Sequence, residues 1–238
     1  FCDALECVIR PIEYPVSRIA FSDPMKEFCA VLFDWSRESL WWPSGFRDKP
    51  DDRYLSAGSE WERAYERLLK NCFPPVSRIN VVSRIPLGEV YFALHRWFCA
   101  LEVETKSRTD GLTPRRALQA FGTEFGRALY EDLWIDLAFS RIDAGDLEPG
   151  PRLIMITDCR FPNECQHVRE RGGVVVRIVR KDQDGVVDLH ESENALGARD
   201  YDYLVNNRGS VADLTLDARR FFSWLGCRGD GVDLLGPT

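Results

Sequence analysis

Several features that would point directly to a function are missing from this 238-residue sequence. None of its eight cysteines forms a CxxC pair, and their spacings suit no common zinc motif. No apolar run is long enough to cross a bilayer, and no signal peptide is visible. There are 31 Lys and Arg against 38 Asp and Glu, so a cationic coat for nucleic acid is lacking. Direct nucleic-acid binding and a membrane partner are therefore not expected, whereas locally converging arginines can still bind a small anion.

What is present is an ordinary globular balance, with 45% hydrophobic and 29% charged residues. The length fits one α/β domain, with or without an inserted subdomain. Because several cysteines lie in apolar runs, we interpret the set as buried or surface free thiols of a reducing compartment, with the cytosol as the default. Residue 1 is Phe, and we therefore expect a chain that begins inside something larger or lacks its true start.

Strand and helix patterns alternate at the two ends of the chain. The apolar runs RLIMIT and VVVRIV are the clearest buried strands, and their continuous apolar character suits a parallel sheet covered on both faces. The sequence thus predicts an α/β fold with a parallel sheet. The expected strands are 17–21, 152–157, 174–179 and 203–206, and the expected helices of this part are 1–11, 25–35, 162–171 and 210–225.

The middle of the chain is predicted to be mostly helical. A polar loop is expected over 36–59, a short strand is one reading of 76–86, and the expected helices are 60–71, 88–104 and 114–141, the last one interrupted around Gly122. We expect one domain over 1–227. It has a sheet core at 1–21 and 146–227 and a helical acceptor-binding or insert region at 22–145, and 228–238 form a mobile tail.

The first group of chemically informative residues follows the strand RLIMIT. Asp158 and Arg160 come directly after this strand, at the edge where open α/β sheets bind ligands. The carboxylate of Asp158 can hold a magnesium-bound water, and the guanidinium of Arg160 can meet a phosphate. The alternative is structural: Asp158 caps the next helix and Arg160 pairs with Glu164.

A second group follows the strand VVVRIV. Arg180 and Lys181 stand at the base of a polar loop that leads to Asp188, His190 and Glu193, and such a loop can close over a polyphosphate. The alternative is a solvated acidic turn, and a lone histidine is weak evidence for catalysis. No Ser/His/Asp order argues for a hydrolase.

A third group lies on the expected helix after Thr113-Pro114. Arg115 and Gln119 are four residues apart and share a helix face, and Arg127 follows about two turns later if the helix continues. Such a stripe suits a phosphate together with a base edge. The alternative is a surface helix with ordinary ion pairs.

Together these segments resemble the deoxynucleoside monophosphate kinases of tailed phages and their relatives, in the order that this family has. The matching stretches are FSDPMKEFCAVLFDW at 21–35, GLTPRRALQAFGTEFGR at 111–127, LW at 133–134, ITDCRFPNE at 156–164, RGGVVVRIVR at 171–180, DLHESE at 188–193 and NNRGS at 206–210.

The resemblance implies a P-loop kinase fold that moves the terminal phosphoryl of ATP, with magnesium, onto a deoxynucleoside monophosphate. It implies that Asp158 and Arg160 sit beside the transferred phosphoryl, and that Arg180 is catalytic or part of the lid. The acceptor side would comprise Asp23, Lys26, Arg115, Gln119, Arg127 and Trp134, and the lid or its hinge would comprise Asp188, His190 and Glu193.

Two departures from the family pattern stand out. No GxxxxGK[ST] occurs within 1–238, and we expect the first strand and its phosphate-binding loop directly upstream of Phe1. Without them this chain is expected to bind ATP poorly and to expose sheet edges. Residues 36–110 also look longer than the family usually has, and their tryptophans are most simply a small extra helical core, with a partner surface as the alternative.

Three hypotheses follow from the sequence. The first is a kinase that makes deoxynucleoside diphosphates for DNA synthesis, in the host cytoplasm if a phage encodes it. The second is a catalytically inactive kinase fold kept as a binding or assembly module. The third is a related P-loop kinase with another acceptor. Since related enzymes can dimerise, a homodimer stays open in each case.

Overall fold

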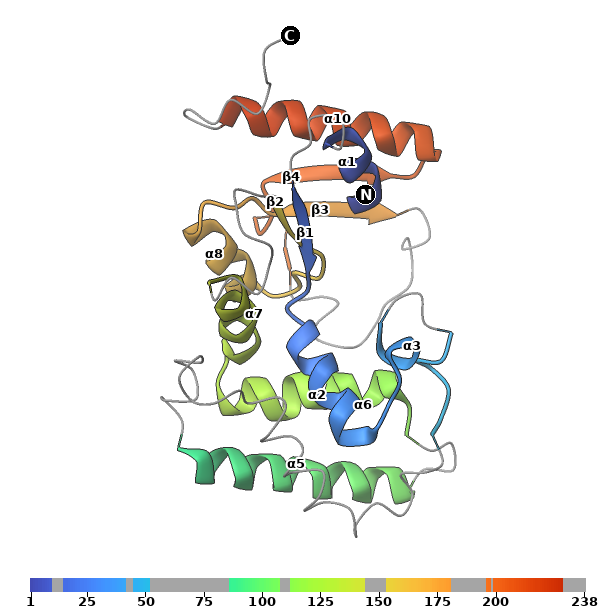
Figure 1. The fold of residues 1–238 in the computed structure, drawn as a ribbon, viewed down its shortest axis with the longest axis vertical. Coiled ribbons are helices and arrows are strands. Elements are labelled where there is room, and N and C mark those ends of the chain that lie inside the picture. Colours follow the sequence, from blue (N-terminus) through green and yellow to red (C-terminus); the bar gives the residue numbers. More distant parts are fainter. Residues whose placement is uncertain are drawn as a thin grey trace. The chain divides into compact units, whose positions relative to one another are not determined.

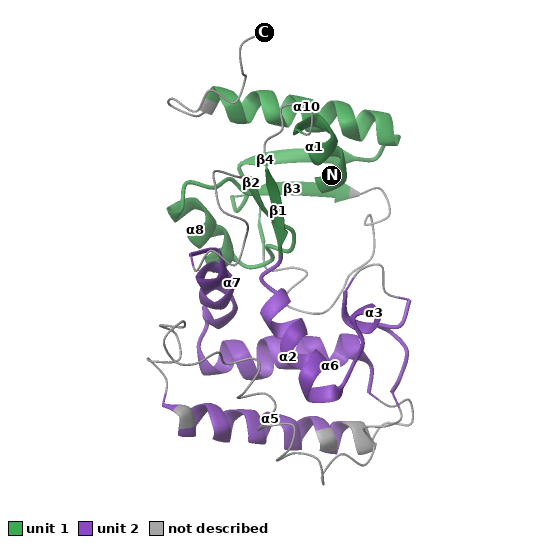
Figure 2. Ribbon diagram, viewed as in Figure 1, with its two compact units in different colours: residues 1–19, 149–238 green, residues 20–148 purple. Residues whose placement is uncertain are grey.

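The computed structural model describes residues 1–9, 15–41, 45–51, 86–107, 112–143, 153–180, 196–197 and 199–228. The chain forms two compact units, shown in green and purple in Figure 2. Unit 1 comprises Phe1–Ile19 and Pro149–Thr238, and unit 2 comprises Ala20–Glu148. These bounds lie close to the predicted limits of the sheet core and the helical region, while the single-domain organisation stays a prediction.

Among its described residues, unit 1 has two pairs of parallel strands. Strand β1 (Val16–Ile19) pairs with β2 (Leu153–Ile156), and β3 (Val176–Arg180) pairs with β4 (Tyr203–Asn207). In the first pair Val16 lies opposite Leu153, although more than a hundred residues of chain separate the two strands. Parallel pairing of this kind requires a long crossover. The mixed α/β class with short parallel strands is confirmed, and it is consistent with a P-loop kinase fold.

In the described part of unit 1, three helices accompany these strands: α1 (Cys2–Ile9), α8 (Pro162–Glu170) and α10 (Val211–Arg228). Helix α10 packs against α1 and β4, as Figure 1 shows. Their apolar faces share a cluster in which Leu5, Ile9, Met155 and Phe221 are buried. This burial stabilises the pairing of both ends of the chain.

Helix α8 ends at a glycine for a conformational reason. Gly172 has φ +76°, a region that residues with a Cβ rarely adopt. The N–H of Gly172 donates to the carbonyl oxygen of Arg169 at 2.9 Å. The N–H of Gly173 donates to the carbonyl oxygen of Val168, also at 2.9 Å. This pattern of two bonds closes the helix and turns the chain toward β3.

The described part of unit 2 is helical. Its helices are α2 (Asp23–Phe33), α3 (Arg37–Leu40), α5 (Leu87–Ser107), α6 (Pro114–Ala120), the π-helix η3 (Phe121–Arg127) and α7 (Leu133–Asp143). They share one apolar core rich in aromatic rings, which includes Phe28, Phe33, Trp97, Phe121 and Phe125. In this unit Phe28 stacks on Phe121 with ring centroids 4.4 Å apart.

Several expectations for unit 2 are changed by the structure. The predicted loop 36–59 contains the short helix α3, and α5 continues to Ser107, beyond the predicted helix end at residue 104. The predicted interruption around Gly122 is confirmed, and it takes the form of a π-helix followed by a second break before Leu133. The predicted helix 60–71, the ambiguous stretch up to residue 85 and the tail from 229 lie outside the described residues. None of the described helices is both long and apolar enough for a membrane span.

Candidate active site

The loop after β2 places an acid and a base at the carboxyl end of a parallel strand. Strand β2 ends at Ile156, and the N–H of Thr157 donates to the carbonyl of Ile19 at 3.0 Å, which ties this edge to β1. Asp158 is half-buried and Arg160 is exposed. A half-buried carboxylate beside an exposed guanidinium is an arrangement that suits a phosphate with its metal ion.

A buried glutamate holds this loop in place. Glu164 is only 5% exposed, and its carboxylate accepts the backbone N–H of Arg160 at 2.6 Å and that of Phe161 at 3.1 Å. The structural alternative pairs Arg160 with Glu164, and these two bonds connect Glu164 to the backbone of this segment. The signal that identifies Glu164 is its place three residues after Phe161, where a glutamate reaches back to the start of a helix. Charge-assisted bonds of this kind fix the backbone that carries Arg160.

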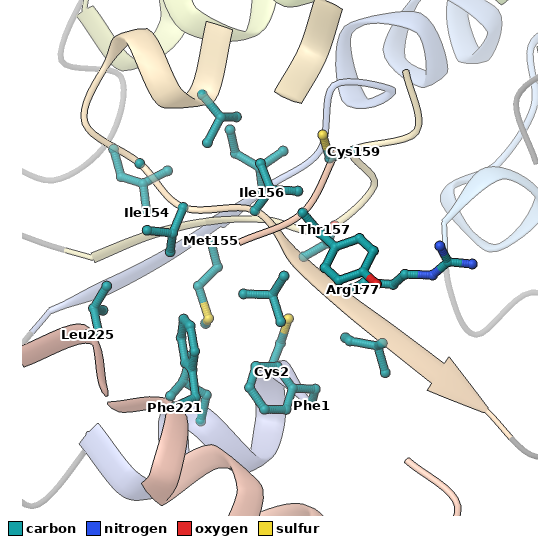
Figure 3. Close-up of a pocket in the computed structure, with 18 of the residues that line it drawn as sticks. Phe1, Cys2, Ile154, Met155, Ile156, Thr157, Cys159, Arg177, Phe221 and Leu225 are labelled. Carbon is teal, nitrogen blue, oxygen red and sulfur yellow. The ribbon is translucent and has the colours of Figure 1, made fainter. Parts of the chain in front are cut away.

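A cavity of about 510 Å³ lies within unit 1. Strands β2 and β3 both line it, together with α1 and α10, as the close-up in Figure 3 shows. Its labelled apolar side chains include Met155, Ile156, Phe221 and Leu225. In the described residues β2 pairs with β1 and β3 pairs with β4, but no ladder joins β2 to β3. The strands β2 and β3 therefore border one space, whose lining is more apolar than polar.

In unit 2, Asp23 and Lys26 form an ion pair at the start of α2. The ammonium of Lys26 lies 3.2 Å from the Asp23 carboxylate, and the indole N–H of Trp41 donates to the same oxygen at 3.1 Å. The other oxygen of Asp23 accepts the N–H of Ala20 at 2.8 Å. Ser22 is the N-cap of this helix, but its side chain makes no capping bond. Asp23 therefore orders the entry into α2.

Helix α6 begins as its sequence predicts. Thr113 is the N-cap, and its hydroxyl accepts the N–H of Arg116 at 3.2 Å, followed by Pro114 in the first turn. Arg115 is exposed and forms an ion pair with Asp48, with Nη2 3.2 Å from Oδ2. The hydrogen bond from Arg115 lowers the pKa of Asp48 below its usual value.

The neighbouring Arg116 is engaged differently. Its guanidinium donates to both carboxylate oxygens of Glu104, at 2.9 and 2.6 Å, and to Glu124 at 3.0 Å. The hydrogen bonds with Glu104 raise the pKa of Arg116 above its usual value. Arg116 therefore fits the structural alternative for this helix, a surface with ordinary ion pairs, and not the ligand-binding one. Of two adjacent arginines, the exposed Arg115 is the better placed to bind a ligand.

Gln119, on α6, and Arg127, the last residue of η3, are both half-buried. A π-helix has a wider turn than an α-helix, so the eight residues that separate them are not two regular α turns. Such segments are rare and occur frequently at functional sites. This conformation therefore supports a functional reading of the stretch.

Trp134 is buried, with 6% of its surface exposed, and its indole N–H donates to the carbonyl of Gly122 at 2.9 Å. A Cβ at Gly126 would lie 2.3 Å from the Trp134 ring, so only glycine allows this approach. The close packing of the ring on η3 holds the indole in a defined orientation.

The predicted site residues divide between the two units. Asp158, Arg160 and Arg180 belong to unit 1, and Arg180 is the last residue of β3, opposite Asn207. The acceptor-side residues all belong to unit 2: Asp23, Lys26, Arg115, Gln119, Arg127 and Trp134. Asp188, His190 and Glu193 lie outside the described residues. Within the described part of the chain, no group of three or more His, Cys, Asp or Glu could hold a metal by itself.

These observations define a kinase-like α/β protein, and comparison with known proteins identifies its family. Residues 67–217 match the model of the deoxynucleotide monophosphate kinase family. Because this match covers more than half of the chain, the protein belongs to that family.

Two viral proteins are similar along most of their length. The deoxynucleoside-5'-monophosphate kinase of Escherichia phage T5 is 27% identical over 218 residues, which are 86% of this chain and 82% of the phage protein. A protein of Acanthamoeba polyphaga mimivirus, named "Putative deoxynucleotide monophosphate kinase", is 25% identical over 201 residues, or 79% of this chain and 74% of the viral protein.

Proposed function

We propose that this protein transfers the γ-phosphoryl group of ATP to a deoxynucleoside monophosphate and so supplies diphosphates for DNA synthesis. The observation that carries the proposal is the family match over 67–217, which contains Arg115, Asp158, Arg160 and Arg180. In phosphoryl transfer the protein contributes mainly position and positive charge, and exposed arginines supply both. The cytoplasm, including that of a host cell, is the location that this activity implies.

In unit 1 the half-buried carboxylate of Asp158 fits magnesium, which prefers oxygen ligands and keeps several waters. When bound, magnesium neutralises phosphate charge. Arg160 contacts the transferred phosphoryl group, and Glu164 keeps the backbone of Arg160 in place. Arg180 adds a further positive charge where β3 ends, and the lid or hinge residues Asp188, His190 and Glu193 exclude water during transfer.

In unit 2 the acceptor nucleotide is held by α6 and η3. Arg115 binds the acceptor phosphate, which replaces Asp48 as the partner of the guanidinium, because a phosphate offers more charge and more acceptor atoms than a carboxylate. Gln119 and Arg127 contact the base or the phosphate, and the fixed indole of Trp134 forms one wall. Asp23 and Lys26 order the start of α2 on the same side.

The cavity between β2 and β3 bears on the phosphate-binding loop. No GxxxxGK[ST] occurs within 1–238, and ATP binding needs an equivalent nest of amide groups. We propose that a further strand, carrying this loop, completes the parallel sheet between β2 and β3. The apolar lining of the cavity and the two strand edges beside it support this proposal.

The test is a coupled phosphotransfer assay with ATP, magnesium and each deoxynucleoside monophosphate. It is run in parallel on the full-length gene product and on residues 1–238. We expect diphosphate formation by the full-length protein and weak ATP binding by residues 1–238 alone. A full-length protein that phosphorylates none of the monophosphates would contradict the proposal. Phosphorylation of a different small molecule would favour a related kinase with another acceptor.

A non-catalytic binding or assembly module is the second candidate, and it is favoured by the missing loop motif within 1–238. The residues encoded directly before Phe1 separate the two. A glycine-rich loop that ends in Lys-Ser or Lys-Thr favours the enzyme, and any other junction favours the module. Size-exclusion chromatography with light scattering tests the open question of a homodimer.

A further inference from the structure

Two thiols lie close together on either side of Arg160 and Glu164. The Sγ atoms of Cys159 and Cys165 are 3.4 Å apart. Cys165 belongs to α8 and is completely buried, whereas Cys159 belongs to the loop after β2, is half-buried and lines the cavity of unit 1. A disulfide bond is about 2.05 Å long, so the sulfurs need to approach by only about 1.4 Å to form one.

The backbone between the two cysteines is already ordered in the reduced protein. Glu164 accepts the N–H of Arg160 and that of Phe161, and both of these residues lie between the thiols. Pro162 opens α8 and restricts the same segment further. Little conformational entropy is therefore lost when the thiols are joined, because most of it has been lost in folding.

The two sulfurs also lie within hydrogen-bonding distance of each other. Thiolates, not thiols, attack disulfides, and a second thiol this close can resolve a mixed disulfide on the first.

We propose that Cys159 and Cys165 form a redox modification site that closes to an intramolecular disulfide by exchange with a low-molecular-weight disulfide such as oxidised glutathione. The thiolate of Cys159, the less buried of the two thiols, attacks one sulfur of the oxidant, forms a mixed disulfide and releases one glutathione thiolate. The thiolate of Cys165 then attacks Sγ of Cys159 and releases the second. The two cysteine protons end on the two glutathione molecules, so the protein is oxidised by two electrons and the oxidant is reduced by two.

The consequence for catalysis rests on the proposed function, whereas the disulfide itself does not. Arg160 is the residue directly after Cys159, so the bond draws the backbone that carries Arg160 toward α8. Displacements of about 1 Å in a phosphoryl-transfer site cost up to roughly a hundredfold in rate. We therefore expect the oxidised enzyme to turn over on the order of tenfold more slowly or worse, with recovery after reduction.

Peptide mapping tests the bond directly. Trypsin cleaves after Arg152, Arg160 and Arg169, so Cys159 lies in LIMITDCR and Cys165 in FPNECQHVR. The full-length protein is treated with oxidised glutathione, alkylated, digested without reductant and analysed by mass spectrometry. We expect these two peptides to be linked as the main product, and to separate after reduction. Glutathione left on Cys159 without this link, or no reaction at either thiol, would overturn the proposal.

Two variants and a control complete the test. Cys159→Ser removes the half-buried thiol, and Cys165→Ala removes the buried one, so at least one of them is expected to fold. We expect neither variant to form the linked peptides. The oxidant should also not slow the turnover of either variant through this site. Cys227→Ser, at an exposed position on α10, keeps the full response. If the link forms but turnover is unchanged, the modification site stands and the assigned role of Arg160 is wrong.

Discussion

The two units differ in how their interiors are filled. In unit 2, rings from α2, α5 and η3 pack against one another, and Phe121 lies with its centroid 4.8 Å from that of Phe125 and 4.8 Å from that of Trp97. In unit 1, two separate strand pairs border a cavity of about 510 Å³. Native interiors are normally close-packed, so a cavity of this size makes the described part of unit 1 less completely filled than the aromatic core of unit 2.

The two units also differ in the functions that we propose for them. Unit 2 presents Arg115 and Gln119 on helices that a filled core supports, which suits a site that must hold an acceptor in one geometry. Unit 1 carries Asp158 and Arg160 on a loop after a strand, where a buried glutamate replaces core packing as the support. The following predictions test the contrast from the largest expected effect to the smallest.

Phe121→Ala removes the completely buried ring at the centre of the unit 2 core. We expect it to cost about 3–5 kcal/mol of unfolding free energy, because transfer and cavity terms add. Urea denaturation monitored by tryptophan fluorescence measures the loss. Phe92→Ala, at a ring that is 73% exposed, is the control and should stay within about 0.5 kcal/mol of the parent. Equal losses in the two variants would show that Phe121 does not anchor a packed core.

Arg160→Ala tests the loop of unit 1 in the full-length protein. We expect kcat to fall on the order of a hundredfold or more, since a charge that stabilises the moving phosphoryl group acts mainly in the transition state. Steady-state kinetics with saturating substrates measures the effect. Arg219→Ala, at an exposed position on α10, should leave kcat unchanged. Near-normal turnover of Arg160→Ala removes this residue from the catalytic group.

Gly126→Ala tests the close approach of η3 and Trp134. The added Cβ would lie 2.3 Å from the indole ring, and we expect a loss of about 1–3 kcal/mol from overpacking. Gly88→Ala is the matched control on α5, where nothing lies within 4 Å of the added methyl group. It should be neutral or stabilise by less than about 1 kcal/mol, because alanine favours helix more than glycine does. A Gly126→Ala variant as stable as the parent would mean that the ring moves at no cost.

Arg115→Ala addresses acceptor binding by unit 2. We expect the KM for the deoxynucleoside monophosphate to rise roughly tenfold with little change in kcat, because this contact is equal in ground and transition states. Asp48→Asn is the informative partner, since it removes the carboxylate that pairs with Arg115 and should leave KM unchanged or lower it. If Arg115→Ala leaves KM unaltered, Arg115 does not bind the acceptor phosphate.

The smallest effect concerns the pH dependence of the same ion pair. Arg115 lowers the pKa of Asp48 in the folded protein, so the pair stabilises fully above the unfolded pKa of about 3.9. This stabilisation is lost as the pH falls through the folded pKa. Because both side chains are exposed, it should be below about 1 kcal/mol. The difference in unfolding free energy between the parent and Asp48→Asn should therefore shrink as the pH falls through the folded pKa of Asp48 and be absent below it. A difference that grows toward low pH would contradict this assignment.

The strand and helix patterns of unit 1 were largely readable from the sequence. Continuous apolar runs predicted β2 and β3. The range predicted for α8 stops at residue 171, directly before Gly172, whose positive φ closes the helix. Thr113-Pro114 likewise predicted the start of α6 through its hydroxyl cap. These signals are local, so a short stretch of sequence carries them completely.

Other features depend on partners that are distant along the chain. The sequence did not reveal that Arg115 pairs with Asp48, which is 67 residues away, or that Arg116 is held by Glu104 and Glu124. The π-helical form of η3 was also missed, since the pattern indicated only an interruption near Gly122. Ion pairs on a helix surface are chosen by whichever residues the fold brings nearby, and spacing along one helix cannot name them.

By itself the sequence determined the α/β class, the order of the family motifs and the residues that follow each strand, because periodicity and turn chemistry act over a few neighbouring residues. Only the tertiary structure decided which strand edges border a cavity, which arginine is engaged by carboxylates and which two cysteines meet at 3.4 Å. The physical reason is that packing and ion pairing are set by distance in space, and the folded chain brings together residues that its sequence separates.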